Sequence, residues 1–288
     1  MIKSILNTVG NTPLIRLSKI ETLFNVKAHI YAKLEYFNPF GSIKDRAALA
    51  IINNAIDKNL LLGKKGILDA TSGNMGISLA AIAQLYNLEC TIVMPENASE
   101  KRKNLLKIYG ANVILTPMEG GINKSIKVAQ EISKEENKYF FTNQFQNSIS
   151  IDAHFSSTAP EIEQSLGVKP DVIISGIGTG GTIMGIANYY KSSHTQIFGV
   201  IPNKKSNIPG LRNNILNSLI DINALSGVVT VNDTNLQSTQ NDLLQYEGIF
   251  AGYSSCANLV ACIDQYQKYN WKDKNIVLIF ADGGERYI

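Results

Sequence analysis

A lysine stands in line with apolar residues within residues 38–56, where a turn is followed by an amphipathic helix. The apolar stripe at helical spacing contains Lys44, Ala48, Ile51 and Ala55. A lysine in the first turn of a helix usually lies at the surface with its stem on apolar neighbours. Alternatively, its amine is partly desolvated, which lowers the pKa of the amine and makes it a nucleophile or a proton carrier. This stretch alone leaves both interpretations open.

A succession of small and polar residues separates the apolar run that ends at Ala70 from the next predicted helix. It consists of Thr71, Ser72, Gly73, Asn74 and Gly76. Backbone N–H groups at such a helix start are open, and the helix dipole favours an anion there. A helix cap with a tight turn accounts for one hydroxyl residue but not for the whole succession. A carboxylate or phosphate site and an ordinary cap both remain open here.

A second turn follows an apolar run and is rich in glycine. Its glycines are Gly176, Gly178, Gly180 and Gly181, and Thr182 opens the next predicted helix. Glycine lets the backbone approach a phosphate closely. The N–H groups and the hydroxyls of Thr179 and Thr182 would then donate hydrogen bonds to it. The turn therefore predicts a phosphate cradle.

The same glycines match the GxGxxG pattern of dinucleotide-binding proteins. Those proteins place an acidic residue roughly 20 residues later to hold the ribose. No Asp or Glu occurs in this chain from Val172 to Ile220. Lys204 and Lys205 follow the next predicted strand and keep an NADP site as an alternative. A cradle for a single phosphate is the more economical interpretation.

One inward lysine, one candidate carboxylate turn and one phosphate cradle indicate a common chemistry. A lysine that forms a Schiff base with a phosphorylated aldehyde, acting on an amino acid, uses all three. We therefore expect pyridoxal 5'-phosphate as the cofactor and a small amino acid as the substrate.

Composition excludes several classes of protein. The 288 residues are 44% hydrophobic and 18% charged, which is typical of a globular chain. The formal charge is +3 and the basic residues are spread along the chain, so we expect no nucleic-acid partner. Three cysteines without CxxC spacing and three separated histidines predict neither a disulfide framework nor a metal site. No apolar run approaches the ~20 residues of a membrane span and no signal peptide is recognised, so we expect a cytoplasmic protein without membrane contact.

Apolar runs alternate with amphipathic helical stretches along almost the whole chain. The runs with strand character include residues 29–37, 66–70, 90–95, 112–117, 139–145, 171–178, 196–202 and 275–282. This alternation predicts an α/β protein with about nine strands in parallel sheets, covered by helices on both faces. Two sheets divided near residues 145–170 fit the usual size of a domain better than one open sheet. Ligands bind such sheets at the carboxyl ends of strands, where both turns lie.

The chain resembles the cysteine synthase family, the fold type II pyridoxal phosphate enzymes that include O-acetylserine sulfhydrylases and cystathionine β-synthases. The motifs that carry the resemblance are "GNTPLIRL", "NPFGSIKDRAA", "TSGNMGISLA", "GIGTGGTIMG", "EGIFAGYSSCA" and "DGGERYI". The stretch 206–214, "SNIPGLRNN", is closer to the B-type, thiosulfate-accepting branch.

The resemblance implies a fold like that of the tryptophan synthase β subunit, with two domains and the cofactor in the cleft between them. Each domain has a mostly parallel twisted sheet covered by helices. Residues 36–146 would form the smaller, substrate-binding domain. Residues 1–35 and 147–288 would form the larger domain that binds the cofactor phosphate. A homodimer is also implied.

The resemblance assigns a role to each residue that matches a family motif. Lys44 would be the Schiff-base lysine, and Asn74 would contact the ring hydroxyl of the cofactor. Ser254 would meet the pyridine nitrogen, although an ordinary helix cap also explains it. Gln144 would bind substrate, although a polar residue at a strand end needs no such role. The cofactor phosphate would be held by Gly178, Thr179, Gly180, Gly181 and Thr182, and the substrate by Thr71, Ser72, Met75, Gln144, Gly210 and Arg212.

The implied reaction is β-replacement that forms L-cysteine from O-acetyl-L-serine and sulfide or thiosulfate through an aminoacrylate intermediate. A neutral Ser254 hydroxyl leaves the ring a weaker electron sink, which suits β-elimination. Lys44 would anchor the cofactor and then act as general base. One alternative is release of hydrogen sulfide from L-cysteine, with formation of serine, lanthionine or cystathionine. An NADP-binding oxidoreductase and a catalytically idle homologue are the alternatives of other classes.

Five departures from the family pattern bear on the substrate. Met75 stands where threonine is usual, so one hydroxyl donor is missing. Cys256 and Ala159 each replace a glycine. Asn213 and Asn214 stand where B-type relatives tend to have an arginine and an aromatic residue. The reaction class is therefore better founded than the substrate.

Overall fold

The chain divides into two compact units in the computed structural model, which describes residues 1–212 and 219–288 apart from the side chain of Glu136. The small unit contains residues 1–7 and 44–150, and the large unit contains residues 8–43 and 151–288. The expected assignment of substrate to residues 36–146 and of cofactor phosphate to residues 1–35 and 147–288 stays a prediction, as does the interdomain cleft. The departures at Asn213 and Asn214 lie outside the described residues.

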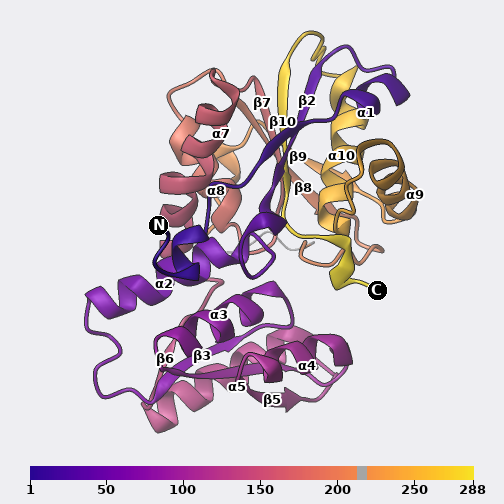
Figure 1. Cartoon of the computed structure of the whole chain (residues 1–288). Helices are drawn as coiled ribbons and strands as arrows, with labels where there is room; N and C mark the ends of the chain where they lie inside the picture. Colours follow the sequence, from indigo (N-terminus) through magenta and orange to yellow (C-terminus); the bar gives the residue numbers. More distant parts are fainter. Residues whose placement is uncertain (213–218) are drawn as a thin grey trace. The chain divides into compact units, whose positions relative to one another are not determined.

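The small unit is built on a parallel sheet of strand order β5-β4-β3-β6 (Figure 1). The strands are β3 (Gly66–Ala70), β4 (Glu89–Pro95), β5 (Asn112–Thr116) and β6 (Tyr139–Phe141), and the helices are α2 (Lys44–Asp57), α3 (Asn74–Leu85), α4 (Glu100–Ile108) and α5 (Gly121–Glu136). Every residue of β3 is buried, including Asp69, because a central parallel strand is covered on both faces. Leu68, Ala70 and Val93 pack with Ala129 of α5 on one face. On the other face, Ile92 lies beside Gly76 of α3.

The large unit contains a sheet of order β1-β2-β10-β7-β8-β9, in which only β1 is antiparallel to its neighbour. The strands are β1 (Leu14–Arg16), β2 (His29–Leu34), β7 (Val172–Gly176), β8 (Gln196–Pro202), β9 (Gly227–Val231) and β10 (Asn275–Phe280). The helices are α1 (Ser18–Leu23), α7 (Ala159–Leu166), α8 (Gly181–Tyr190), α9 (Leu236–Asp242) and α10 (Tyr253–Tyr266), while α6 (Ile149–Ala153) crosses from one unit into the other. Helices α7 and α8 lie on one side of this sheet, and α9 and α10 lie on the other (Figure 1). The sheet is therefore buried on both faces.

The predicted α/β fold with two mostly parallel sheets is confirmed. The two strands absent from the prediction are β1 and β9, which lie at opposite edges of the large sheet. Edge strands bury fewer side chains than central ones, and the burial pattern of β9 mixes exposed with buried positions. Their apolar signal is therefore weaker than that of β7 or β10.

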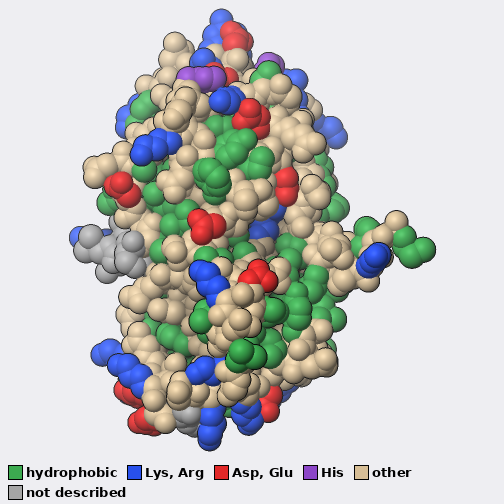
Figure 2. All heavy atoms as spheres, turned by 90° about the vertical axis from the view of Figure 1, so that its left-hand side faces the viewer, with side chains coloured by type: hydrophobic (Ala, Val, Ile, Leu, Met, Phe, Trp, Pro, Cys, Tyr) green, Lys and Arg blue, Asp and Glu red, His purple; other side chains and the backbone are tan. Residues whose placement is uncertain are grey.

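The described residues contain neither a membrane-spanning helix nor a cluster of metal-ligating side chains. No helix there is both long and apolar enough to cross a membrane. No cluster of three or more His, Cys, Asp and Glu side chains suited to a metal ion occurs there either. On the face drawn in Figure 2, Lys and Arg side chains stand beside Asp and Glu and between apolar side chains.

Candidate active site

Lys44 is the first residue of α2 and is partly exposed, while the stripe below it, Ala48, Ile51 and Ala55, is buried. The next residue, Asp45, fixes this end of α2 to the start of α3. Ser78 Oγ lies 2.6 Å from Asp45 Oδ1 and 3.1 Å from the carbonyl oxygen of Asn74. Lys44 and Asn74 therefore open two helices whose first turns are held together within the small unit.

The turn of residues 71–74 joins β3 to α3 and is held by its own backbone and side-chain hydrogen bonds. The Thr71 N–H donates to the Val93 carbonyl at 3.0 Å, and the Gly73 N–H donates to Thr71 Oγ1 at 3.2 Å. Gly73 precedes α3 without any side-chain cap. The first N–H groups of this twelve-residue helix therefore point to where an anion is favoured.

Gln144 follows β6 and reaches the same end of the sheet. It is 5% exposed, and its Nε2 donates to the carbonyl of Ala70 at the long distance of 3.3 Å. The Met75 side chain is 2% exposed, so it offers almost no surface to a ligand in this structure. Thr71, Ser72, Asn74 and Gln144 are thus gathered at the carboxyl end of β3, and at position 75 the backbone is better placed than the side chain to contact a ligand.

The glycine turn of residues 176–181 lies in the large unit between β7 and α8. Gly180 has a φ of +94°, which favours glycine, and it precedes α8 without a side-chain cap. A Cβ atom at Gly178 would lie 2.5 Å from the carbonyl oxygen of Gly210, and one at Gly176 would lie 2.4 Å from Leu211 Cδ2. The Arg212 N–H donates to the Ile177 carbonyl at 2.9 Å. The backbone of residues 210–212 therefore packs directly on the glycine turn, which brings Gly210 and Arg212 beside the predicted phosphate residues.

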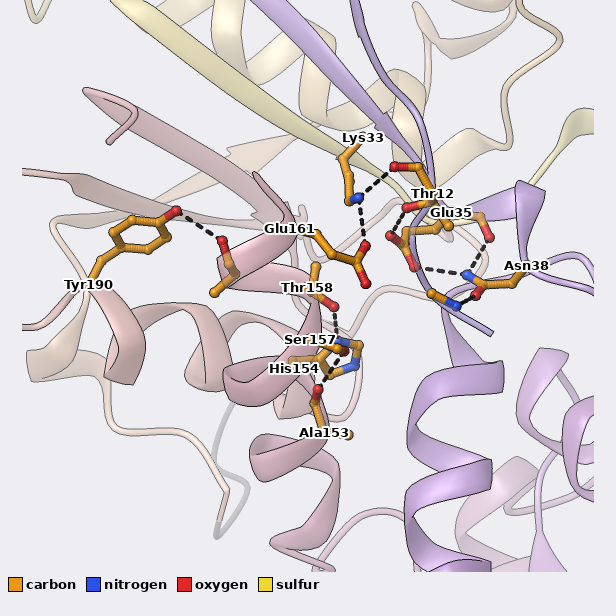
Figure 3. Close-up of polar contacts among 12 residues, drawn as sticks. Thr12, Lys33, Glu35, Asn38, Ala153, His154, Ser157, Thr158, Glu161 and Tyr190 are labelled. Carbon is orange, nitrogen blue, oxygen red and sulfur yellow. Dashed lines mark hydrogen bonds and ion pairs between the residues drawn. The ribbon is translucent and has the colours of Figure 1, made fainter. Parts of the chain in front are cut away.

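Thr182 in the first turn of α8 contacts a histidine that has no role in the sequence-based prediction. Thr182 Oγ1 lies 3.1 Å from His154 Nε2, and His154 Nδ1 lies 2.8 Å from Thr158 Oγ1. Figure 3 shows His154 and Thr158 in the π-helical segment that precedes α7. No local spacing in the sequence indicates the Thr182 contact, because 28 residues separate the two side chains.

Ser254 is buried in the first turn of α10, after β9 in sequence and beside β10 in space. Asn258 Oδ1 lies 3.6 Å from the position of a Cβ atom at Gly176, so this end of α10 passes close to the glycine turn. Burial raises the pKa of the Cys256 thiol to about 12, which keeps it protonated near neutral pH. Burial lowers the pKa of Arg212.

Comparison with known proteins assigns the chain to a family. A family model described as pyridoxal-phosphate dependent enzyme matches residues 5–282. A cysteine synthase of Aquifex aeolicus is 36% identical over 296 aligned residues, which cover 99% of this chain and 90% of that protein. The chain belongs to the pyridoxal-phosphate dependent enzymes of the cysteine synthase family.

Two solved structures have the same fold as this chain. A hydrogen sulfide-producing enzyme of Fusobacterium nucleatum matches with a TM-score of 0.93 at 34% identity and covers 100% of both chains. A cysteine synthase of Entamoeba histolytica matches with a TM-score of 0.93 at 30% identity, covering 100% of this chain and 89% of that chain. The predicted fold type II class is confirmed.

The glycine turn fits the phosphate of pyridoxal phosphate, on which a cysteine synthase family enzyme depends. Glycine is needed at 176, 178 and 180 because a Cβ atom there would meet Leu211, Gly210 or Ile220, so the backbone of the turn packs closely on these residues. Uncapped N–H groups at the start of α8 and the Thr182 hydroxyl are suitable donors. This fit and the family together favour a single phosphate over a dinucleotide.

Replacing Gly178 by alanine tests the phosphate cradle of this cysteine synthase family member. The new Cβ atom would lie 2.5 Å from the backbone oxygen of Gly210, so one of the two segments must shift. We expect the affinity for pyridoxal phosphate, measured by titration of cofactor-free protein, to fall at least about tenfold, or ~1.4 kcal/mol. Affinity for pyridoxal, which lacks the phosphate, should fall less. Equal losses for both compounds, or no loss for either, would contradict the assignment.

Proposed function

We propose that this enzyme catalyses β-replacement on O-acetyl-L-serine with sulfide or thiosulfate and so forms L-cysteine. The observation that carries the proposal is the 36% identity to a cysteine synthase over 99% of the chain. The two anion-binding turns and Lys44 support it, because an amino-acid carboxylate, a cofactor phosphate and a reactive amine are the three groups that this chemistry requires.

Lys44 Nζ would hold pyridoxal phosphate covalently. The same amine would take the proton from the α-carbon of the substrate, which requires Nζ to be held close to that carbon. Its place at the first residue of a helix tied to α3 through Asp45 and Ser78 limits how far it moves. Bound pyridoxal phosphate supplies the electron sink for this step.

The turn of residues 71–74 and Gln144 orient the substrate by its carboxylate. N–H groups at the start of α3 and the Gln144 amide donate to the two carboxylate oxygens. Asn74 would contact the ring hydroxyl of bound pyridoxal phosphate, and the Ser254 hydroxyl would meet the ring nitrogen without adding charge. Residues 178–182 would hold the phosphate. Arg212, with Gly210 on the substrate loop, pairs with an anionic leaving group or sulfur donor.

A second reaction of the same class has its own support. The Fusobacterium nucleatum structure that covers 100% of this chain is that of a hydrogen sulfide-producing enzyme. The buried Met75 in place of a threonine also removes a hydroxyl donor from the substrate turn. Release of sulfide from L-cysteine, with water or a second thiol adding, is therefore the second candidate. A homodimer, a cytoplasmic location and a B-type preference for thiosulfate are further predictions from the family resemblance.

A direct comparison of turnover decides between the two reactions. We expect the purified enzyme, loaded with pyridoxal phosphate, to convert O-acetyl-L-serine with sulfide at a higher kcat/KM than it releases sulfide from L-cysteine alone. A higher kcat/KM with L-cysteine would overturn the choice of substrate and keep the reaction class. Turnover of neither compound, nor of other β-substituted alanines, would overturn the class for this chain and point to an idle homologue.

A further inference from the structure

Asp69 places a carboxyl group in the interior of the small unit. It lies on β3 and is 1% exposed. Its Oδ1 atom accepts a hydrogen bond from the Ala70 N–H at 2.9 Å, whereas Oδ2 has no hydrogen-bond partner among the described residues. A buried carboxylate with one unsatisfied oxygen is costly, and most of this cost disappears in the neutral acid.

Strand alternation places Asp69 on the same face of the sheet as the candidate carboxylate turn. Leu68 and Ala70 pack with Ala129 of α5 on one face, so Asp69 and Thr71 project to the opposite face, where α3 lies. Asp69 therefore precedes Thr71 by one strand repeat, roughly 7 Å, on the side from which α3 begins. A charge there is close enough to act on an anion bound at the turn.

The polar neighbours of Asp69 come from the segment after β6. They are Thr142, which is fully buried, and Gln144, whose amide donates to the Ala70 carbonyl at 3.3 Å. Interactions with Thr142 and Gln144 favour the ionised form of Asp69. Burial favours the neutral acid and outweighs these interactions. The pKa of Asp69 is therefore raised to about 7.

The elements packed beside Asp69 carry few groups that could change charge with it. The Asp69 charge acts on Cys90 of β4, but burial raises the pKa of that thiol far above the ordinary value. Helix α3, which covers this face, has no titratable side chain. The start of α2, which is held to α3, carries the charged residues Lys44, Asp45 and Arg46.

We propose that Asp69 is a positioning residue for the substrate carboxylate: as a neutral acid it leaves Gln144 and the turn of residues 71–74 free to bind a carboxylate, and on ionisation it weakens that binding. The ionised form acts in two ways. It repels a second carboxylate across a poorly solvated distance, and it attracts the Gln144 amide that the substrate needs. This inference rests on the proposed function, because it takes the turn as the site of the amino-acid carboxylate.

Propionate is a suitable probe, because its own charge is constant above about pH 6 and it needs no turnover. We expect calorimetric titration of the enzyme loaded with pyridoxal phosphate to give a Kd for propionate that rises about tenfold from about pH 6 to about pH 8.5. The direction follows from a raised pKa, since Asp69 is protonated below about 7 and ionised above it. In Asp69→Asn, which is neutral at every pH, the Kd should stay at its low-pH value. Equal pH dependence in both proteins would overturn the inference.

Replacing Thr142 by valine gives a second measurement if Asp69→Asn does not fold. This change removes a group that favours ionised Asp69, so the midpoint of the pH dependence should move upward. Thr116→Val is the matched control. Thr116 is also buried in the small unit, but its hydroxyl contacts Ser125 at 2.8 Å, so its loss should leave the midpoint unchanged. An unmoved midpoint in Thr142→Val, or equal shifts in both variants, would overturn the inference.

Turnover separates this inference from the proposed function. Efficient β-replacement with propionate binding that does not change with pH overturns the role of Asp69 and leaves the function intact. Failure of propionate to bind at any pH overturns the carboxylate turn and the inference with it. If turnover of every β-substituted alanine is also absent, the proposed function fails as well.

Discussion

Lys44→Ala should lower kcat for β-replacement at least about 1,000-fold, because the variant loses both the covalent anchor of the cofactor and the base that takes the α-proton. Both roles are assigned to the Lys44 amine, so a single substitution removes both. The measurement is initial-rate kinetics on enzyme saturated with pyridoxal phosphate. Borohydride reduction followed by peptide mass spectrometry gives a readout independent of activity, and the pyridoxyl group should be found on Lys44 in the natural sequence.

Lys58→Ala is the matched control for Lys44→Ala. Lys58 directly follows α2 and is exposed, so its loss removes one positive charge without touching the start of the helix. Its kcat and its pyridoxyl modification at Lys44 should be unchanged. If Lys44→Ala kept a tenth or more of the activity, or if the modification appeared on another lysine, the central assignment would be wrong.

Lys33→Met should destabilise the large unit by about 3–5 kcal/mol, because it breaks a buried ion pair. Lys33 is fully buried on β2, and its Nζ lies 2.7 Å from Glu161 Oε2 and 2.7 Å from the Thr12 carbonyl oxygen (Figure 3). In the variant the Glu161 carboxylate, 12% exposed, loses the ammonium group of Lys33 at 2.7 Å. Thermal unfolding followed by circular dichroism, with cofactor-free protein, measures the effect without a contribution from ligand binding.

Two further variants test whether the loss of stability in Lys33→Met comes from breaking a buried ion pair. Lys33→Met combined with Glu161→Leu removes both charges, so it should recover much of the lost stability. Lys274→Met breaks an exposed pair in the same unit, between Lys274 and Asp171 at 2.9 Å, and should cost less than about 1 kcal/mol. Similar losses for Lys33→Met and Lys274→Met would show that burial of the pair does not matter.

The sequence predicted those features that depend on spacing within one element. Apolar runs located β3, β7 and β10, because a strand buried on both faces has no polar alternation. The glycine turn before α8 was recognised because residues without side chains are a local requirement of close backbone contact. Family motifs then gave the order of the candidate site residues along the chain.

The features that escaped prediction depend on contacts between distant segments. Lys33 and Glu161 are 128 residues apart, and His154 and Thr182 are 28 residues apart. The sequence analysis assigned no role to Asp69, because its raised pKa comes from burial of β3 by the surrounding elements. Spacing rules do not report such pairs, because tertiary packing alone decides which segments meet.

The pairing of β2 with β10 also orders events during synthesis of the protein. These strands join residues 29–34 to residues 275–280 in the middle of the large sheet. A ribosome-bound chain therefore keeps β2 without this parallel neighbour until residues 275–280 have been made, whereas the strands β3, β4, β5 and β6 of the small sheet have all been made by residue 141. The small sheet can pair its strands early, and the large sheet closes only after β10 has emerged.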